Sequence, residues 1–403
     1  MDPQADTIAS VATSEVVATI ASARAIAPRL AASAGRSEAA RQVDTDAVTA
    51  LREAGLARLL KPRRHAGAEL PLRAQIEACI ETAHGCSAAS WLMMVCGAHD
   101  FVLGGFPDPC LEEVWASGPD TLIAGTLAPQ GKVRRAEGGW ILDGRWQFCS
   151  GVDHSPWLMF GALQADAQND QQPWGAVHLM VPKHEIEVID TWHVLGMRGT
   201  GSKDVVATQV FVPAHRSMPT PALFTGMSPH ASSALYHLPV MASLASMAAG
   251  SVYGMAERAY ADYVGRTRVR QDVLIGGGKA HHSGLQRRVA EARLELDSAR
   301  RLLDFICARF DALTRADDKP LSPQLRVSMR LDAAYVVELC RRAIERVFAV
   351  SGAHAVYDDS ELQRVHRDVH TASHHAIFDF DLSTEFVGRT ILGVDLGPEH
   401  AIS

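Results

Sequence analysis

A block of short strand-like runs separates two regions whose apolar residues recur at helical spacing. Within residues 121–213, the runs TLIAGTLAP, PWLMFGAL and DVVATQVFVP carry β-branched and aromatic residues and are bounded by Gly, Pro or Asp. This pattern is typical of strands joined by tight turns. After the block, apolar residues recur every three or four positions over 285–310 and 329–350. Such stripes predict long amphipathic helices that pack lengthwise.

The first 120 residues are also patterned for helices. The stretch TDAVTALREAG starts on the cap-forming pair Thr45 and Asp46 and stops at Gly55. We therefore expect an α+β chain, with a central β-barrel or sandwich of about six to eight strands between two helical parts. The predicted domains are an N-terminal helical domain over 1–120, a central β domain over 121–217 and a C-terminal helical bundle over 218–403.

Charge and cysteine content argue against several classes of protein. The net charge of −7 argues against a generic nucleic-acid binder. No apolar run reaches the roughly 18 residues of a membrane helix, and the acidic start MDPQADTIAS is unlike a secretory signal. The seven cysteines form no CxxC pair, which favours reduced thiols and a cytoplasmic location. We expect no nucleic-acid partner and no membrane partner.

Several common catalytic motifs are missing from the sequence. There is no GxxxxGK[ST], no GxGxxG after a strand and no GxSxG elbow, which weighs against nucleotide hydrolysis, classical dinucleotide binding and serine hydrolysis. His366, His370 and His374 would share one face of a helix, so a metal site is one interpretation. Because no companion motif such as HExxH is present, we favour a partly exposed polar stripe and expect no metal.

Two bends rich in glycine and hydroxyl groups punctuate the β block. WQFCSGVDHSPW places Ser150 and Gly151 among aromatic residues, and RGTGS over 198–202 repeats the same chemistry later in the chain. Free backbone N–H groups and hydroxyls beside aromatic walls suit a planar heteroaromatic ligand with a polar edge. A structural turn with core aromatics is the alternative. We expect the second bend to face the first across a small barrel.

Three segments resemble the acyl-CoA dehydrogenase superfamily. GGWILDGRWQFCSG resembles its flavin-embracing turn, TWHVLGMRGTGSKDVVATQVFVP its G-M-R-G-T segment, and SGAHAVYDDSELQRVHRD its R-x-x-R-D element, in the family's order. The resemblance implies that fold over roughly residues 10–395. A common position of the family's catalytic Glu corresponds to about Ala376, within HHAIFDFD. Acyl-CoA dehydrogenation would lack its usual proton acceptor there.

Within this fold, the chain resembles the two-component flavin-dependent monooxygenases, such as the oxygenase component of 4-hydroxyphenylacetate hydroxylase. The resemblance implies reduced FMN or FAD as co-substrate, O2, and a separate NAD(P)H:flavin reductase as partner. It also implies a homo-oligomer, usually a tetramer, and hydroxylation of a phenolic or polycyclic aromatic molecule through a C4a-hydroperoxyflavin. The alternatives are an acyl-CoA dehydrogenase-like flavoprotein that oxidises a thioester, oxygenation at nitrogen or sulfur, and a relative that has lost catalysis.

The same resemblance assigns roles to residues. Ser150 would bond flavin N5, His375 would supply a proton beside the oxygen-reacting carbon, and His99 would accept the substrate's phenolic proton. A dry substrate pocket would be lined by Trp91, His99, Thr126, Trp157 and Trp192. The flavin would be held by Trp146, Phe148, Cys149, Ser150, Gly151, Arg198, Thr200, Gly201 and Ser202. Its phosphate would be bound by Arg266 and Arg268, for which an exposed basic helix end is the alternative.

Overall fold

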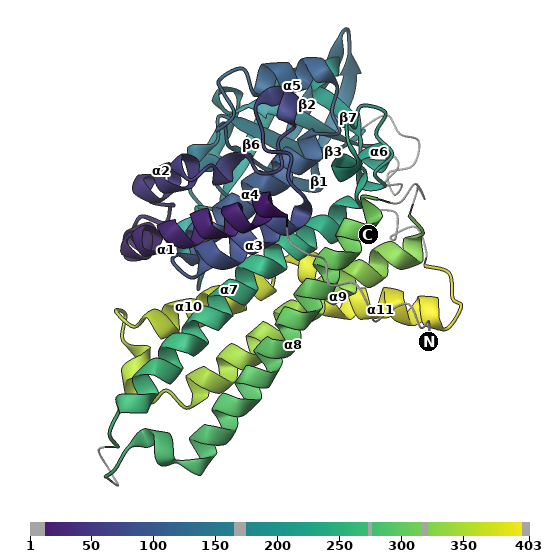
Figure 1. Cartoon of the computed structure of the whole chain (residues 1–403). Coiled ribbons are helices and arrows are strands. Elements are labelled where there is room, and N and C mark those ends of the chain that lie inside the picture. The colour runs from purple at the N-terminus through teal and green to yellow at the C-terminus, as the bar shows by residue number, and fades with distance from the viewer. Residues whose placement is uncertain (1–12, 165–174, 273–275, 316–320, 397–403) are drawn as a thin grey trace.

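The computed structural model describes residues 13–164, 175–272, 276–315 and 321–396 (Figure 1). The first helices are α1 (Ser14–Ala40), α2 (Thr45–Glu53), α3 (Leu72–Ala83), α4 (Ser87–Leu103) and α5 (Asp108–Val114). The strands are β1 (Ile123–Ala136), β2 (Gly139–Cys149), β3 (Trp157–Gln164), β4 (Ala176–Pro182), β5 (Glu187–Ile189), β6 (Lys203–Pro213) and β7 (Ser217–Pro219). The later helices are α6 (Thr220–Phe224), α7 (Val240–Val269), α8 (Ser283–Leu313), α9 (Pro323–Ala349), α10 (Glu361–Ser373) and α11 (Phe380–Ile391).

The described strands form one mixed seven-stranded sheet in the order β5-β6-β2-β1-β3-β4-β7. β1 and β3 pair in parallel, and the other neighbours pair antiparallel. The strand number lies within the predicted range. Trp146, Leu142 and Phe160 belong to a separate core formed by the sheet. Every residue of β4 is buried, with Met180 in the helical core and Leu179 in the core of the sheet, so the helices cover the other face of this strand.

The predicted apolar stripes form the seams of the long helices. Along α8 and α9 the buried members include Leu296, Leu303, Val336 and Val347, which belong to the helical core. Helices α7, α8 and α9 pack along one another and extend away from the sheet (Figure 1). The stripes thus have the packing role that the sequence predicted for them.

Local signals explain where α2 begins and ends, although its cap is Asp44, one residue before the predicted pair Thr45 and Asp46. The carboxylate of Asp44 caps α2 by accepting from Asp46 N, and Gly55 follows the helix with φ 73°, a conformation that glycine adopts without strain. The predicted domain limit at 217 falls on Ser217, the first residue of β7, which pairs with β4. The division into three domains stays a prediction. In the parts of the chain that the structure describes, every helix is too short or too polar to cross a membrane.

Candidate functional site

The two predicted bends lie side by side. The hydroxyl oxygens of Ser150 and Ser202 are 2.6 Å apart, and Gly151 N donates to Thr200 O at 3.2 Å. The cause is strand pairing, because Cys149 at the end of β2 lies opposite Lys203 at the start of β6. The expectation that the bends face one another across a barrel was therefore wrong in detail. They meet as adjacent ends of neighbouring strands.

The three hydroxyl groups of the bends form a chain with one direction. Thr200 Oγ1 donates to the carbonyl of Met197 at 2.9 Å, and Ser202 Oγ lies 2.6 Å from Thr200 Oγ1. Each hydroxyl carries one hydrogen. Since Thr200 uses its hydrogen on Met197, Ser202 donates to Thr200 and Ser150 donates to Ser202. The lone pairs of Ser150 Oγ therefore remain as acceptors for a ligand N–H group.

Aromatic side chains flank the bends, as the sequence predicted. Phe148 has φ 64°, an uncommon conformation for a bulky residue, and its side chain is 60% exposed. Its ring meets Trp192 edge-on, with centroids 6.1 Å apart and planes at 85°. This exposed ring beside the Ser150 acceptor offers a flat apolar surface with a polar edge. Strained backbone of this kind is often found at ligand sites.

Trp146 and Cys149 lie on the opposite side of β2 from this surface. Both are fully buried in the core of the sheet. The indole of Trp146 stacks on Phe160 at 4.4 Å and donates to Gly161 O at 2.8 Å. Alternation along the strand turns Trp146 inward, and the register shift between Trp146 and Cys149, where Phe148 has φ 64°, turns Cys149 to the same side. Their placement favours a packing role over the predicted contact with the cofactor.

The second bend is held in place by α10. Asp368 is buried and accepts from Met197 N at 2.5 Å. Burial raises the pKa of Asp368, and the Met197 hydrogen bond opposes this shift. Arg367 Nη1 donates to Leu195 O at 2.7 Å. The Arg-Asp pair of the predicted R-x-x-R-D element therefore fixes the backbone that precedes Thr200.

His375 follows α10 and lies beside Trp91 of α4, with ring centroids 5.9 Å apart. Its Nδ1 accepts from Ile377 N at 3.2 Å, so in the neutral ring the proton resides on Nε2. Dense packing around the ring, followed by the charge of Arg330, lowers the pKa of His375. The residue as a whole is exposed in the single chain. His375 is thus a neutral side chain with Nε2–H available as a donor.

Arg330 of α9 supports the turn that carries His375. It is 6% exposed, and its guanidinium donates to Ile377 O at 3.2 Å and Ala376 O at 3.0 Å. The sequence reasoning missed this residue. Its only signal is an arginine on the mostly apolar buried face of α9, a feature that it shares with Arg326.

His99 on α4 is in the opposite tautomer to His375. Its Nδ1 lies 2.8 Å from Val95 O, and a carbonyl oxygen can only accept, so Nδ1 carries the proton and Nε2 is an acceptor. The side chain is 5% exposed, and burial lowers the pKa of His99 to about 4. His99 is therefore neutral above that pH and can take a proton at Nε2.

The remaining predicted pocket residues have contacts of their own. Thr126 Oγ1 donates to Gln147 O at 3.1 Å, which joins β1 to β2 just before the first bend. Trp157 lies under the guanidinium of Arg216 at 5.1 Å. Arg216 is in turn paired with Glu113 of α5. The roles of Thr126 and Trp157 toward a substrate stay predictions.

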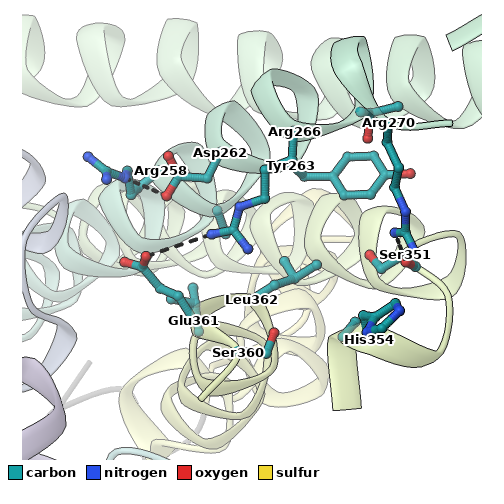
Figure 2. A pocket seen from close by; sticks show the side chains of 14 residues that line it. Arg258, Asp262, Tyr263, Arg266, Arg270, Ser351, His354, Ser360, Glu361 and Leu362 are labelled. Carbon is teal, nitrogen blue, oxygen red and sulfur yellow. Dashed lines mark hydrogen bonds and ion pairs between the residues drawn. The ribbon is translucent and has the colours of Figure 1, made fainter. Parts of the chain in front are cut away.

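A cavity of about 280 Å³ lies between α7 and the loop that follows α9 (Figure 2). Arg266 lines it and reaches toward Glu361 at 4.0 Å, and Arg270 donates to Ser351 O at 2.9 Å. The polar part of the lining comprises the carboxylates of Asp262 and Glu361 and the cations and hydroxyls of Arg258, Tyr263, Arg266, Thr267, Arg270, Ser351 and Ser360. Guanidinium and hydroxyl groups of this kind suit a phosphate.

Arg268 is the one predicted phosphate residue outside this lining. It is exposed, and it lies about 200° around the helix axis from Arg266, whereas Arg270 is one turn further along the same face. The structure places Arg270 in the lining and Arg268 outside it, because α7 continues as a helix to Val269. The role of Arg268 toward a phosphate stays a prediction.

A second, smaller cavity is lined both by residues of the second bend and by residues that also line the first cavity. Arg198 and Gly199 line it, together with Arg364 of α10. Arg258 and Glu361 line both cavities. Arginines therefore line the two cavities from the Arg198 bend to Arg270, with the carboxylates of Glu38, Asp262, Glu361 and Asp368 among them.

Comparisons with known proteins agree with this architecture. The family described as "Acyl-CoA dehydrogenase, C-terminal domain" matches residues 246–380. The chain is 31% identical to the FADH(2)-dependent resorcinol hydroxylase, oxygenase component, of Rhizobium sp. (strain MTP-10005), over 92% of this chain and 93% of that protein. It is 28% identical to the p-hydroxyphenylacetate 3-hydroxylase, oxygenase component, of Acinetobacter baumannii, over 93% and 88% of the two chains.

The fold is likewise similar to that of a solved relative. The crystal structure of 3-HSA hydroxylase from Rhodococcus sp. RHA1 superposes with a TM-score of 0.86 at 28% identity, covering 94% of this chain and 97% of that one. The predicted acyl-CoA dehydrogenase-like fold class is confirmed.

Proposed function

The chain belongs to the flavin-dependent monooxygenases of the acyl-CoA dehydrogenase fold, the oxygenase components of two-component systems, and we propose that it hydroxylates a phenol. Reduced FMN or FAD, when bound, supplies the electrons that allow one atom of O2 to enter the substrate. The observation that carries the proposal is the directed hydroxyl chain from Ser150 to Met197 beside the exposed Phe148 ring.

Three side-chain atoms have complementary roles toward a reduced flavin and a phenol. Ser150 Oγ has free lone pairs and would accept the N5–H of the reduced ring, which keeps that proton in place. His375 Nε2–H would donate a hydrogen bond to the reacting oxygen, and His99 Nε2 would accept the phenolic proton. Phe148 and Trp192 would cover the ring and exclude water.

The arginines that line the two cavities support binding of the flavin phosphate. Arg266 and Arg270 would hold it, while Arg198 would lie nearer the ring. A guanidinium fork binds phosphate oxygens with directed, charge-assisted hydrogen bonds. These assignments replace the predicted pair of Arg266 and Arg268.

The thioester-oxidising alternative has less support than the monooxygenase reading. The relatives described above are oxygenase components, and the residue at the position of the usual catalytic carboxylate is Ala376. Oxygenation at nitrogen or sulfur needs no phenolic proton acceptor. A substrate phenol is therefore favoured by the acceptor atom of the buried His99.

The proposal extends to partners and location. A separate reductase would supply the flavin, using NADH or NADPH. Exposed apolar side chains on the long helices, including Leu294, Phe305 and Tyr335, would be covered by further copies of the chain in a tetramer. All seven cysteines are free and buried, which supports a reducing cytoplasm.

The deciding experiment mixes the protein anaerobically with reduced FMN or FAD and then with O2. We expect the absorbance of oxidised flavin to return more slowly than for free flavin. With phenols added, an oxygenated product should form, whereas matched methyl ethers, which have no phenolic proton, should give none. Identical kinetics with and without protein would refute the proposal. Reduction of bound oxidised flavin by an acyl-CoA thioester would establish the alternative.

A further inference from the structure

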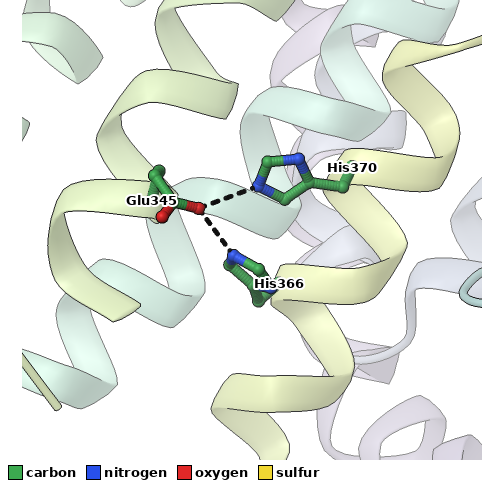
Figure 3. A group of neighbouring side chains, drawn as sticks. All are labelled: Glu345, His366 and His370. Carbon is green, nitrogen blue, oxygen red and sulfur yellow. Dashed lines mark hydrogen bonds and ion pairs between the residues drawn. The ribbon is translucent and has the colours of Figure 1, made fainter. Parts of the chain in front are cut away.

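Three potential metal ligands meet on the face that α10 presents to the end of α9 (Figure 3). Glu345 Oε2 lies 2.9 Å from His366 Nε2 and 3.3 Å from His370 Nε2. The two histidines are one helical turn apart on α10, so their side chains project from the same face. All three ligand atoms lie within 4.8 Å of one another.

Neighbouring side chains hold the two imidazoles in this arrangement. The ring of His366 stacks on Phe348 with centroids 4.1 Å apart, and it contacts the ring of His370 with centroids 4.4 Å apart. Nε2 of His370 is shielded from solvent and makes no hydrogen bond within the described part of the chain. Its contact with Glu345 at 3.3 Å is too poorly angled to count as one. In the tautomer that carries its proton on Nδ1, this buried nitrogen has a lone pair available for a cation.

The spacing matches the geometry of a small divalent ion. Tetrahedral sites with bonds of about 2.0–2.2 Å have ligand atoms about 3.3–3.6 Å apart. The Glu345–His370 distance of 3.3 Å lies in this range, and the Glu345–His366 distance of 2.9 Å is shorter. Two imidazoles and one carboxylate suit zinc and its neighbours, whereas calcium and magnesium prefer oxygen ligands. The nearby cation Arg341 is bonded through two nitrogens to Glu338, at 2.9 and 2.8 Å.

We propose that Glu345, His366 and His370 form a binding site for a zinc-class divalent ion that fastens α10 to α9. Of the three histidines of the predicted polar stripe, only His366 and His370 belong to this site. His374 lies beyond the last residue of α10 and is exposed. The site is separate from the proposed flavin chemistry and does not depend on it. It acts on the helix whose Arg367 and Asp368 hold the second bend.

The test uses the full chain after dialysis against a chelator. Titration calorimetry with ZnCl2 should show one ion per chain, and CoCl2 should give the intense visible bands of a tetrahedral nitrogen- and oxygen-bound ion. H366Q and H370Q should each weaken zinc binding by about 10-fold or more. H374Q, the matched control on the same segment, should bind as the wild type does. MgCl2 should produce no comparable heat.

Folding of the variants is checked in the presence of chelator, where their melting temperatures should equal that of the wild type. If a histidine variant fails this check, E345Q serves instead, because Glu345 has a side chain that is 54% exposed. Zinc should raise the melting temperature of the wild type and of H374Q only. No zinc binding by the wild type, or equal binding by all the variants, would overturn the site. Equal binding of magnesium would overturn the assigned class of ion.

Discussion

The hydroxyl oxygens of Ser150 and Ser202 lie 2.6 Å apart, although 52 positions separate the two residues. Their separation is short because β2 ends where its neighbour β6 begins. The direction of the hydrogen bonds is fixed further along, where Thr200 donates to Met197 O. The acceptor character of Ser150 is therefore a property of four residues together.

Replacing Ser150 with alanine tests the proposed contact with the reduced ring. The variant loses one acceptor, worth about 1 kcal/mol, so oxidised flavin should reappear about 5-fold faster after oxygen is added, with more H2O2 released. Ser246→Ala is the control, because that buried hydroxyl donates to Ala242 O within α7. A return rate unchanged by Ser150→Ala, or equally changed by Ser246→Ala, would contradict the assignment.

Arg330→Met tests whether the buried guanidinium positions His375. Two hydrogen bonds from a charged donor to Ala376 O and Ile377 O are lost, which should destabilise the protein by about 3 kcal/mol. The pKa of His375 should rise, because the Arg330 charge helps to hold it down.

NMR titration of His375 provides the measurement for Arg330→Met. Arg330→Lys should restore most of the pKa shift, since it keeps the charge. Arg326→Met, one turn earlier on the buried side of α9, should leave the His375 titration unchanged. If Arg326→Met moves it as far as Arg330→Met does, the effect is one of general packing.

Arg270→Met tests the proposed phosphate site. Affinity for FMN and FAD should fall by roughly 10-fold or more, because a charged hydrogen bond to phosphate is lost. Affinity for riboflavin, which has no phosphate, should stay the same. Arg268→Met is the matched control, since Arg268 is exposed on another face of α7. Equal losses in both variants would restore the original prediction for Arg268.

The raised pKa of His84 predicts that the free energy of unfolding decreases at alkaline pH. Burial alone would lower its pKa, but hydrogen bonds with Glu257 and Glu81 outweigh burial and raise the pKa of His84 to about 9. The folded state therefore holds this proton more tightly than the unfolded state, whose pKa is near 6.5. The stabilisation, roughly 3 kcal/mol, is fully present below pH 6.5 and is lost as the pH rises through 9.

Urea unfolding at pH 6 and at pH 9.5 measures this loss. His84→Gln should be less stable at pH 6 and should lose much less stability between the two pH values. His184→Gln, at a histidine whose side chain is 80% exposed, should retain the wild-type difference. A full alkaline loss in His84→Gln would show that another group is responsible.

The sequence predicted the elements better than their mutual placement. Periodic burial identifies long helices, and turn residues identify short strands, because both signals are local. The order of strands in the sheet depends on contacts between distant segments, so the adjacency of the two bends was misjudged. Trp146 was assigned to the cofactor because aromatic residues line both cores and ligand sites, and only the pairing of β2 shows which way its indole points. The sequence does not distinguish Arg330 from other arginines of a long helix, because its contact with Ala376 O joins segments that are distant in the chain.

The hydrogen bond from Met197 N to Asp368 has a consequence for recombining relatives of this enzyme. If a chimeric chain takes its sheet from one parent and its last helices from another, Met197 and Asp368 come from different parents. The Met197 N–H of one parent would then face the residue at position 368 of the other parent, in a helix that packs differently. Hybrids that carry residues 191–202 and 361–373 from the same parent keep the pair intact, and libraries should be cut accordingly.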